Sequence, residues 1–235
     1  RNTQITTEIK NTYFKKYNKM FSQYISSVLL AFAVLASSAQ AATVTAKSYV
    51  VTVQGSDGNV ICNGALINKD TVVTAATCLA FYDPDQLVVG VEDQIVKIKS
   101  HTFDSSFDFV TMENDVAVLK LAQSVEGEYI SLASQAPNTG ASGVVSSVNG
   151  TLPVSIVGTS DCASGDYSWS EDEVFASMLC GYASDNKSCV GRNGSPVVVS
   201  NKLVGLVSWG GCGSKSKPAV FTNVVALSSW ISQNE

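Results

Sequence analysis

Six cysteines and a single histidine carry the most distinctive side-chain chemistry in this sequence of 235 residues. The cysteines are Cys62, Cys78, Cys162, Cys180, Cys189 and Cys212. Secreted cysteines pair as disulfides, whereas the cysteines of zinc sites commonly show Cys-x-x-Cys spacing. No two cysteines here have that spacing and His101 lies far along the chain from all of them, so we expect no metal. The even number instead predicts disulfides, but six cysteines allow 15 connectivities and spacing does not choose among them.

A leader segment would supply the oxidising compartment that disulfides need. Residues 20–41 contain an apolar run, Ile25–Ala36, followed by Ala39-Gln40-Ala41, the small-x-small pattern of a signal peptidase site. The run is shorter than the roughly 20 residues of a membrane-spanning helix; a buried core helix is the alternative interpretation. We therefore predict a signal peptide over 20–41, a secreted, extracellular protein and no membrane contact after cleavage. Residues 1–19 are interpreted as an upstream extension or artefact, and residues 42–235 as the folded domain.

The composition excludes several classes of protein. With 45% hydrophobic and 15% charged residues, the chain is not intrinsically disordered. Cleavage after Ala41 would remove five basic residues and one acidic residue, and the net charge would fall from −5 to −9. An acidic domain is a poor ligand for nucleic acid, so we expect none as a partner. A basic protein surface, or one that binds through apolar contacts, fits better.

Short runs rich in valine dominate the rest of the chain and are separated by turn signals such as Asn149-Gly150 and Asn193-Gly194. The runs are 48–54, 59–67, 87–91, 94–99, 116–121, 197–199, 203–209 and 220–224. β-branched residues in short runs at this spacing predict an all-β sandwich or barrel. The one helical pattern is at the end, where Val224, Leu227, Trp230 and Ile231 share a face.

Four ordered motifs resemble the chymotrypsin-like (trypsin) serine protease family. They are TVVTAATC at 71–78, NDVAVLKL at 114–121, SCVGRNGSPVV at 188–198 and VGLVSWGGCG at 204–213. The resemblance implies an all-β fold of two six-stranded antiparallel β-barrels with a C-terminal α-helix. It also implies the disulfides Cys62–Cys78, Cys162–Cys180 and Cys189–Cys212.

The same resemblance places the catalytic triad, and two of its three positions have changed. Asp115 is the retained acid, Thr77 stands where the family has histidine, and Asn193 stands where it has the nucleophilic serine. A threonine hydroxyl does not serve as a base near neutral pH, and a carboxamide is not an activated nucleophile. We expect no rescue from His101 or Ser195, because near-contact alignment with substrate is required for attack.

The position before the nucleophile has also changed. In the family an aspartate there receives the ammonium of the new N-terminus after zymogen cleavage, whereas this chain has Arg192. Arginine would repel that ammonium, and the Ile/Val-Val-Gly-Gly sequence that supplies it is missing. These concordant changes predict a pseudoprotease.

Parts of the substrate-binding cleft are retained. Ser208, Trp209 and Gly210 match the strand that pairs with a substrate backbone, and Gly191 matches the oxyanion-hole glycine. Lys187 matches the base of the primary specificity pocket, where trypsin-like members have aspartate. It would reject basic side chains; an equally weighted alternative is a lysine turned out to solvent from a collapsed pocket.

Three Asn-x-Ser/Thr sequons are candidate glycosylation sites: Asn149, Asn186 and Asn193. Asn149 lies in a turn-like stretch and is the best candidate. A glycan on Asn193 would block the former active site.

The leading functional hypothesis is a secreted, inactive serine protease homologue that works by protein binding, including inhibition of another secreted hydrolase, without a cofactor. The glucanase-inhibitor proteins of plant-pathogenic oomycetes are one such kind on this scaffold. An active trypsin-like endopeptidase is the alternative from a different class. A third hypothesis is a decoy that binds protease inhibitors through Ser208–Gly210.

Overall fold

A computed structural model describes residues 44–46, 48–210 and 212–235. Their elements belong to one unit of the chain, residues 43–235. The leader predicted at 20–41 and the extension at 1–19 lie outside the described residues. Within the described part, no helix is both long and apolar enough to cross a membrane.

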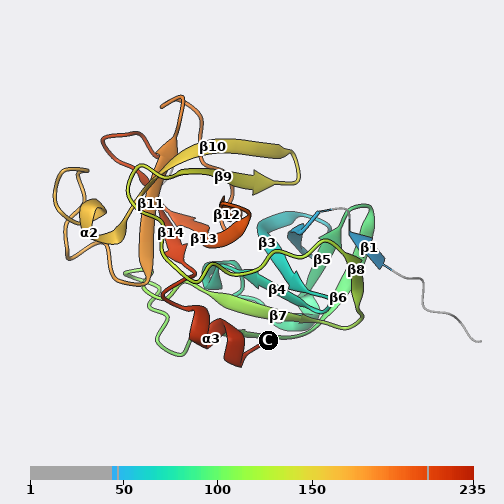
Figure 1. Ribbon diagram of the computed structural model, residues 1–235. Coiled ribbons are helices and arrows are strands. Elements are labelled where there is room, and N and C mark those ends of the chain that lie inside the picture. The colour runs from blue at the N-terminus through green and yellow to red at the C-terminus, as the bar shows by residue number, and fades with distance from the viewer. Residues whose placement is uncertain (1–43, 47, 211) are drawn as a thin grey trace, which may run out of the picture. The chain divides into compact units, whose positions relative to one another are not determined.

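Two closed β-barrels of six strands each form the fold, as the resemblance implied (Figure 1). In the first barrel the strands follow the order β2 (Val50–Gly55), β3 (Val60–Asn68), β4 (Thr71–Thr74), β7 (Ala117–Leu121), β6 (Gln94–Phe103) and β5 (Leu87–Val91). In the second the order is β10 (Gly150–Val157), β11 (Met178–Ala183), β14 (Ala219–Asn223), β13 (Lys202–Trp209), β12 (Pro196–Val199) and β9 (Ser142–Ser147). Neighbouring strands in both barrels are antiparallel, so all-β is confirmed as the fold class.

Short elements complete the chain. β1 (Val44–Ala46) pairs in parallel with β8 (Val125–Gly127). Among the described residues the helices are η1 (Ala76–Cys78), η2 (Pro84–Gln86), α2 (Thr159–Cys162) and α3 (Ser228–Gln233). The predicted C-terminal helix is therefore present, but it begins after Val224 and Leu227, which pack in the same cluster as Ile231.

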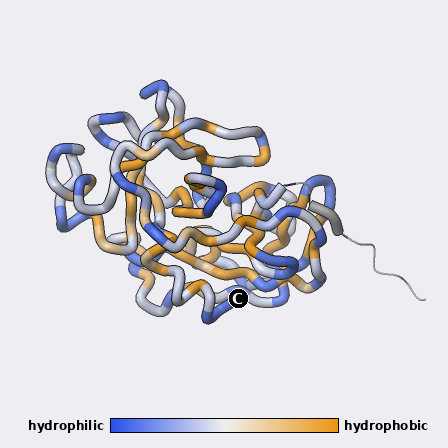
Figure 2. Tube along the Cα trace, in the orientation of Figure 1, coloured by the Kyte–Doolittle hydropathy of each residue, from blue (hydrophilic) through white to orange (hydrophobic). Residues whose placement is uncertain are grey.

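Alternating valines explain why these segments are strands, since branched side chains fit a pleated, half-buried surface. Apolar residues follow the strands of both barrels (Figure 2). A further apolar cluster joins the barrels: Val73 and Val118 of the first pack with Leu206 of the second and with Ile231 of α3. Residues of both barrels and of α3 therefore pack together in one cluster.

The three disulfides implied by the resemblance are all formed: Cys62–Cys78, Cys162–Cys180 and Cys189–Cys212. The first ties β3 to η1, and the third ties the 188–195 segment to the residues after β13. Two of the bridges therefore support the segments that carry Thr77 and Asn193.

Candidate functional site

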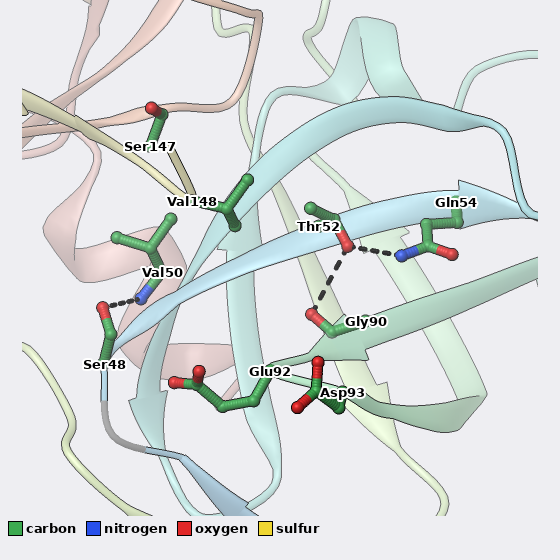
Figure 3. Close-up of a pocket in the computed structure, with 9 residues that line it drawn as sticks. All are labelled: Ser48, Val50, Thr52, Gln54, Gly90, Glu92, Asp93, Ser147 and Val148. Atoms are coloured by element: carbon green, nitrogen blue, oxygen red, sulfur yellow. Dashed lines mark hydrogen bonds between the residues drawn. The ribbon is translucent and has the colours of Figure 1, made fainter. Parts of the chain in front are cut away.

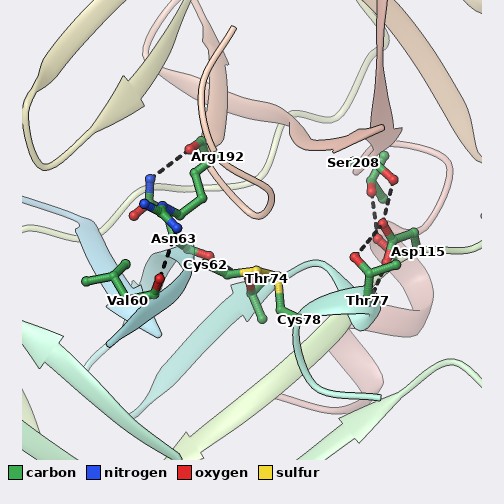
Figure 4. The surroundings of a disulfide bond; sticks show 11 residues. Val60, Cys62, Asn63, Thr74, Thr77, Cys78, Asp115, Arg192 and Ser208 are labelled. Carbon is green, nitrogen blue, oxygen red and sulfur yellow. Dashed lines mark hydrogen bonds between the residues drawn. A yellow bond between two sulfur atoms is a disulfide. The ribbon is translucent and has the colours of Figure 1, made fainter. Parts of the chain in front are cut away.

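The carboxylate of Asp115 lies at the centre of a closed hydrogen-bond network. It precedes β7, and Asp115 is only 2% exposed. Its Oδ1 accepts from the backbone N–H of Thr77 at 2.8 Å, while Oδ2 accepts from the Thr77 hydroxyl at 3.2 Å and the Ser208 hydroxyl at 2.5 Å. Figure 4 shows the three side chains pointing toward one another beside the Cys62–Cys78 bridge. The structure therefore brings the retained acid and the replaced histidine position into direct contact.

Burial governs the electrostatics of this carboxyl group. Removing the charged form from water raises the pKa of Asp115 above its ordinary value of 3.8, although the hydrogen bonds from Ser208 and Thr77 act in the opposite direction. The Asp115 carbonyl also accepts from the Thr222 hydroxyl at 2.6 Å. Both hydroxyls from the second barrel, Ser208 and Thr222, thus bond the same residue of the first.

The Thr77 hydroxyl takes the place at which a triad needs a base. In a working triad the acid orients an imidazole, which then accepts the proton of the nucleophile. Here the Thr77 hydroxyl donates to the acid and has no comparable proton-accepting nitrogen to offer. The network links the two barrels through the Asp115 carboxylate.

His101 does not replace the missing base. Its side chain lies on β6, and its Nε2 is 3.0 Å from the carbonyl oxygen of Tyr82. The side chains of Thr77 and Ser208 donate to the Asp115 carboxylate instead. His101, the only histidine in the sequence, therefore bonds the loop that contains Tyr82 on the first barrel.

Asn193 lies in a turn that is bonded to both barrels. Its carbonyl accepts from the N–H of Asn63 at 3.0 Å, and the N–H of Gly194 donates to Val207 at 2.7 Å. Gly194 has φ +76°, and a Cβ there would lie 2.1 Å from the Asn63 carbonyl oxygen. Only glycine fits this close approach, so the backbone around Asn193 is tightly held.

Ser195 points inward and is fully buried, with no exposed surface. Its hydroxyl oxygen accepts from Nδ2 of Asn63 at 2.8 Å. The Ser195 hydroxyl is therefore buried against β3 rather than exposed at the surface.

Asn63 is the residue at this site that sequence reasoning missed. Its side chain is 3% exposed, although it lies on β3 among apolar neighbours. A buried amide needs a partner, so an asparagine between apolar residues in the middle of a strand was the available signal. The partner itself, 132 positions away, was not readable from the pattern.

Arg192 is exposed and its Nη1 donates to the Val60 carbonyl at 2.9 Å. Figure 4 shows Arg192 beside Asn63 and Val60, on the side of the disulfide away from Asp115. The resemblance places an aspartate at this position, whereas the guanidinium of Arg192 bonds the first residue of β3. Together with the two Asn63 bonds, this contact forms what we call the β3 latch: Val60, Asn63, Arg192, Asn193 and Ser195.

The residues that the resemblance assigns to substrate pairing lie at the end of β13. Ser208 and Trp209 end β13, with a bulge in its pairing to β14 at this point, and Gly210 follows. The Ser208 hydroxyl is occupied by Asp115, and the Trp209 ring meets Trp169 edge-on at 5.0 Å between centroids.

Lys187 is exposed, as one of the two interpretations of this position expected. Its loop folds around the Asp185 carboxylate, which accepts from the N–H of Lys187 at 2.9 Å and the Ser188 hydroxyl at 2.6 Å. These bonds, that of the hydroxyl above all, lower the pKa of Asp185 to about 2.

Gly191 lies at a hollow of about 220 Å³ that is shared with the β9–β10 hairpin. Gly191 is exposed with φ +106°, and Asn149 also lines the hollow.

Of the three sequon asparagines, Asn149 is exposed at the hairpin tip, as a glycan acceptor needs to be. Asn186 is also exposed but its Oδ1 accepts from the N–H of Lys215 at 2.7 Å, and Asn193 is half-buried.

A separate hollow of about 330 Å³ lies beside β2, away from the triad positions (Figure 3). Thr52 there donates to the Gly90 carbonyl at 3.4 Å and accepts from Gln54 at 2.7 Å. These polar groups bond one another. Within the described residues, no group of three or more His, Cys, Asp and Glu side chains could hold a metal.

Comparisons with known proteins agree with this geometry. The family model described as Trypsin matches residues 37–231. Trypsin theta of Drosophila erecta is 36% identical, with 80% of this chain and 82% of that protein covered. Trypsin of Sarcophaga bullata is 35% identical, with 80% and 84% covered. The solved structure of neuropsin, described as a serine protease expressed in the limbic system of mouse brain, superposes with a TM-score of 0.69 at 20% identity, covering 80% of this chain and 94% of that one.

Proposed function

Because the chain belongs to the trypsin family of chymotrypsin-like serine proteases, we propose that it is a secreted, catalytically inactive member that acts by binding another protein. One observation carries the proposal. The Thr77 hydroxyl donates to Asp115 at 3.2 Å, at the position where the family mechanism requires a base.

The nucleophile position supports the same conclusion. Asn193 offers a carboxamide, and the nearest serine along the chain, Ser195, is buried and bonded to Asn63. In a comparable triad, loss of the serine or the histidine lowers turnover by about 10⁶. Proteolysis at a physiological rate is therefore not expected.

The partner we propose is a secreted hydrolase that the protein inhibits. The family fold is intact, and a net charge of −9 after leader removal favours a partner with a basic surface. A protease inhibitor is the second partner class, because Ser208, Trp209 and Gly210 retain the substrate strand. Under that hypothesis the protein would be a decoy that spares active relatives.

An active endopeptidase is the competing function, and the names of the curated relatives favour it, since both relatives above are called trypsin. It would require a base that neither Thr77 nor His101 provides.

Intact-mass analysis of the secreted, oxidised protein before and after a fluorophosphonate probe separates the two. We expect no mass gain, while an active trypsin treated in parallel gains one probe. A stoichiometric gain would show an activated serine and overturn the proposal. Inhibition is then tested by adding the unlabelled protein to secreted hydrolases and measuring their rates; binding to standard-mechanism protease inhibitors instead would identify a decoy.

A further inference from the structure

Two loops of the first barrel bring a group of aromatic and apolar side chains together at the surface. One segment follows η1, runs into η2 and reads Phe-Tyr-Asp-Pro-Asp at 81–85. The other begins at the last residue of β6 and reads Phe-Asp-Ser-Ser-Phe-Asp-Phe-Val at 103–110. We call their apolar members the aromatic patch: Phe81, Tyr82, Phe103, Phe107, Phe109 and Val110.

The four phenylalanine rings of the aromatic patch form a continuous series of contacts. Phe81 meets Phe109 edge-on with centroids 5.1 Å apart, and Phe107 meets Phe109 at 6.1 Å. Phe103 meets Phe107 at 6.4 Å. Edge-to-face pairs at these distances are attractive, so the two loops present one surface.

The patch is held in place from below. Phe107 is half-buried and packs against the core of the first barrel. The His101 ring bonds the Tyr82 carbonyl, which ties β6 to the first loop, and the Asp108 carboxylate accepts from the N–H of Val110 at 2.7 Å. Rings that are already positioned lose little conformational freedom on binding, which favours affinity.

The outer members of the patch are unusually exposed for apolar side chains. Phe81 is 75% exposed, Phe109 46% and Val110 91%. Scattered apolar residues are normal on a surface, but contiguous exposed rings rimmed by polar groups mark interaction sites.

Carboxylates alternate with the rings and determine which partner fits. Asp83, Asp85, Asp104 and Asp108 lie within the two loops, and neither loop contains lysine or arginine. Acidic groups attract cationic side chains, and ring faces also bind cations. A second copy of this chain would bring two acidic rims together, which disfavours self-association.

We propose that the aromatic patch docks a segment of the partner protein in which lysine or arginine alternates with apolar side chains. This inference rests on the proposed binding function and gives that function a surface. In the sequence the patch begins four residues after Thr77 and ends five residues before Asp115.

The test uses the oxidised full-length secreted protein and short fluorescein-labelled peptides of equal length. One peptide alternates lysine with leucine, the second glutamate with leucine, and the third lysine with glycine. Fluorescence anisotropy should show that the lysine–leucine peptide binds at least about tenfold more tightly than either of the others.

The Phe81→Ser/Phe109→Ser double variant should bind the lysine–leucine peptide about tenfold or more weakly than the parent protein. The matched control is Val148→Ser, an equally apolar side chain that is 57% exposed on the β9–β10 hairpin and outside the patch; it should bind as the parent does.

Each opposite result would overturn the inference. Equal binding by the double variant and the control would remove the patch from the interaction. If the glutamate–leucine peptide bound as tightly as the lysine–leucine peptide, the patch would have no preference for basic segments. If analytical ultracentrifugation showed a dimer of the parent protein and a monomer of the double variant, the occupant of the patch would be a second copy of this chain. Fluorophosphonate labelling of the same samples keeps the two proposals apart. Labelling refutes the inactive state, whereas absent labelling together with absent peptide binding refutes only the docking surface.

Discussion

At the scale of single residues, the site is explained by which donors reach the Asp115 carboxylate. The acid is retained in a network of Thr77 and Ser208 that needs no substrate. Its retention is therefore a consequence of structure: a buried carboxylate with its hydrogen bonds satisfied is costly to disturb.

Placing a serine at position 193 alone should not produce a reactive nucleophile. We expect Asn193→Ser to remain unlabelled by a fluorophosphonate, because no base stands beside the new hydroxyl. The Thr77→His/Asn193→Ser double variant should label measurably, since Asp115 is already placed to orient the imidazole. Thr77→His alone is the matched control. Stoichiometric labelling of the single Asn193→Ser variant would mean that the protein contains another base.

The pKa of Asp115 makes a pH-dependent contribution to stability whose sign can be worked out. Its folded pKa is raised above the ordinary 3.8, so the folded state holds the proton more tightly than the unfolded state. The wild type should therefore lose stability relative to Asp115→Asn as pH rises above that value, with a slope of at most about 1.4 kcal/mol per pH unit, and the difference should level off above the folded pKa. Urea unfolding of both proteins across pH measures it. A difference that stays flat, or that grows in favour of the wild type, would contradict the raised pKa.

At the scale of elements, the β3 latch shows how the nucleophile turn keeps its shape without a nucleophile. Asn63 bonds both the Asn193 carbonyl and the Ser195 hydroxyl, and Arg192 bonds the Val60 carbonyl. Strand β3 of the first barrel thus supports a turn that precedes β12 of the second.

Removing the Asn63 amide should destabilise the protein. Asn63→Ala leaves the buried Ser195 hydroxyl without its donor, at a cost of about 1–3 kcal/mol in the free energy of unfolding. Adding Ser195→Ala should cost little more, because the orphaned group is then absent. Chemical denaturation of the two single variants and the double variant gives the coupling energy. The control is Asn138→Ala, which changes an exposed asparagine and should stay within about 0.5 kcal/mol. Strict additivity would show that Asn63 and Ser195 do not interact.

At the scale of the whole molecule, the barrels share one apolar cluster and two hydroxyl contacts to Asp115. Ile231 of α3 is fully buried in that cluster. The barrels are therefore expected to unfold together.

Truncating the Ile231 side chain should lower the free energy of unfolding. We expect Ile231→Ala to cost about 2–5 kcal/mol through the cavity it leaves, while unfolding remains a single transition for both barrels. Ile95→Ala is the matched control, because Ile95 is 56% exposed, and it should cost far less. Calorimetry and near-ultraviolet circular dichroism report the transitions. Two separated transitions in the wild type would show that the barrels fold independently.

The sequence by itself determined the class of the fold and its family. Valine runs predicted strands such as 87–91, which match β5, because alternating branched side chains are a local signal. They missed four barrel strands: β4, β9, β10 and β11. In β9 and β11, Gly143 and Gly181 interrupt the pattern, and pairing with neighbouring strands decides the conformation. The motif order identified Thr77 and Asn193 as replacements, and the three disulfide pairings followed from the same resemblance.

Only the tertiary structure decided what the replaced residues now contact. That the Thr77 hydroxyl meets Asp115, that Asn63 bonds Ser195, and that Phe81 meets Phe109 all depend on how strands close into barrels and how the barrels pack. These partners are separated by tens of residues in the chain, so no local pattern of side chains encodes their distance. The physical reason is that hydrogen bonds and ring contacts require ångström-scale placement, and that placement comes from the packing of the whole core.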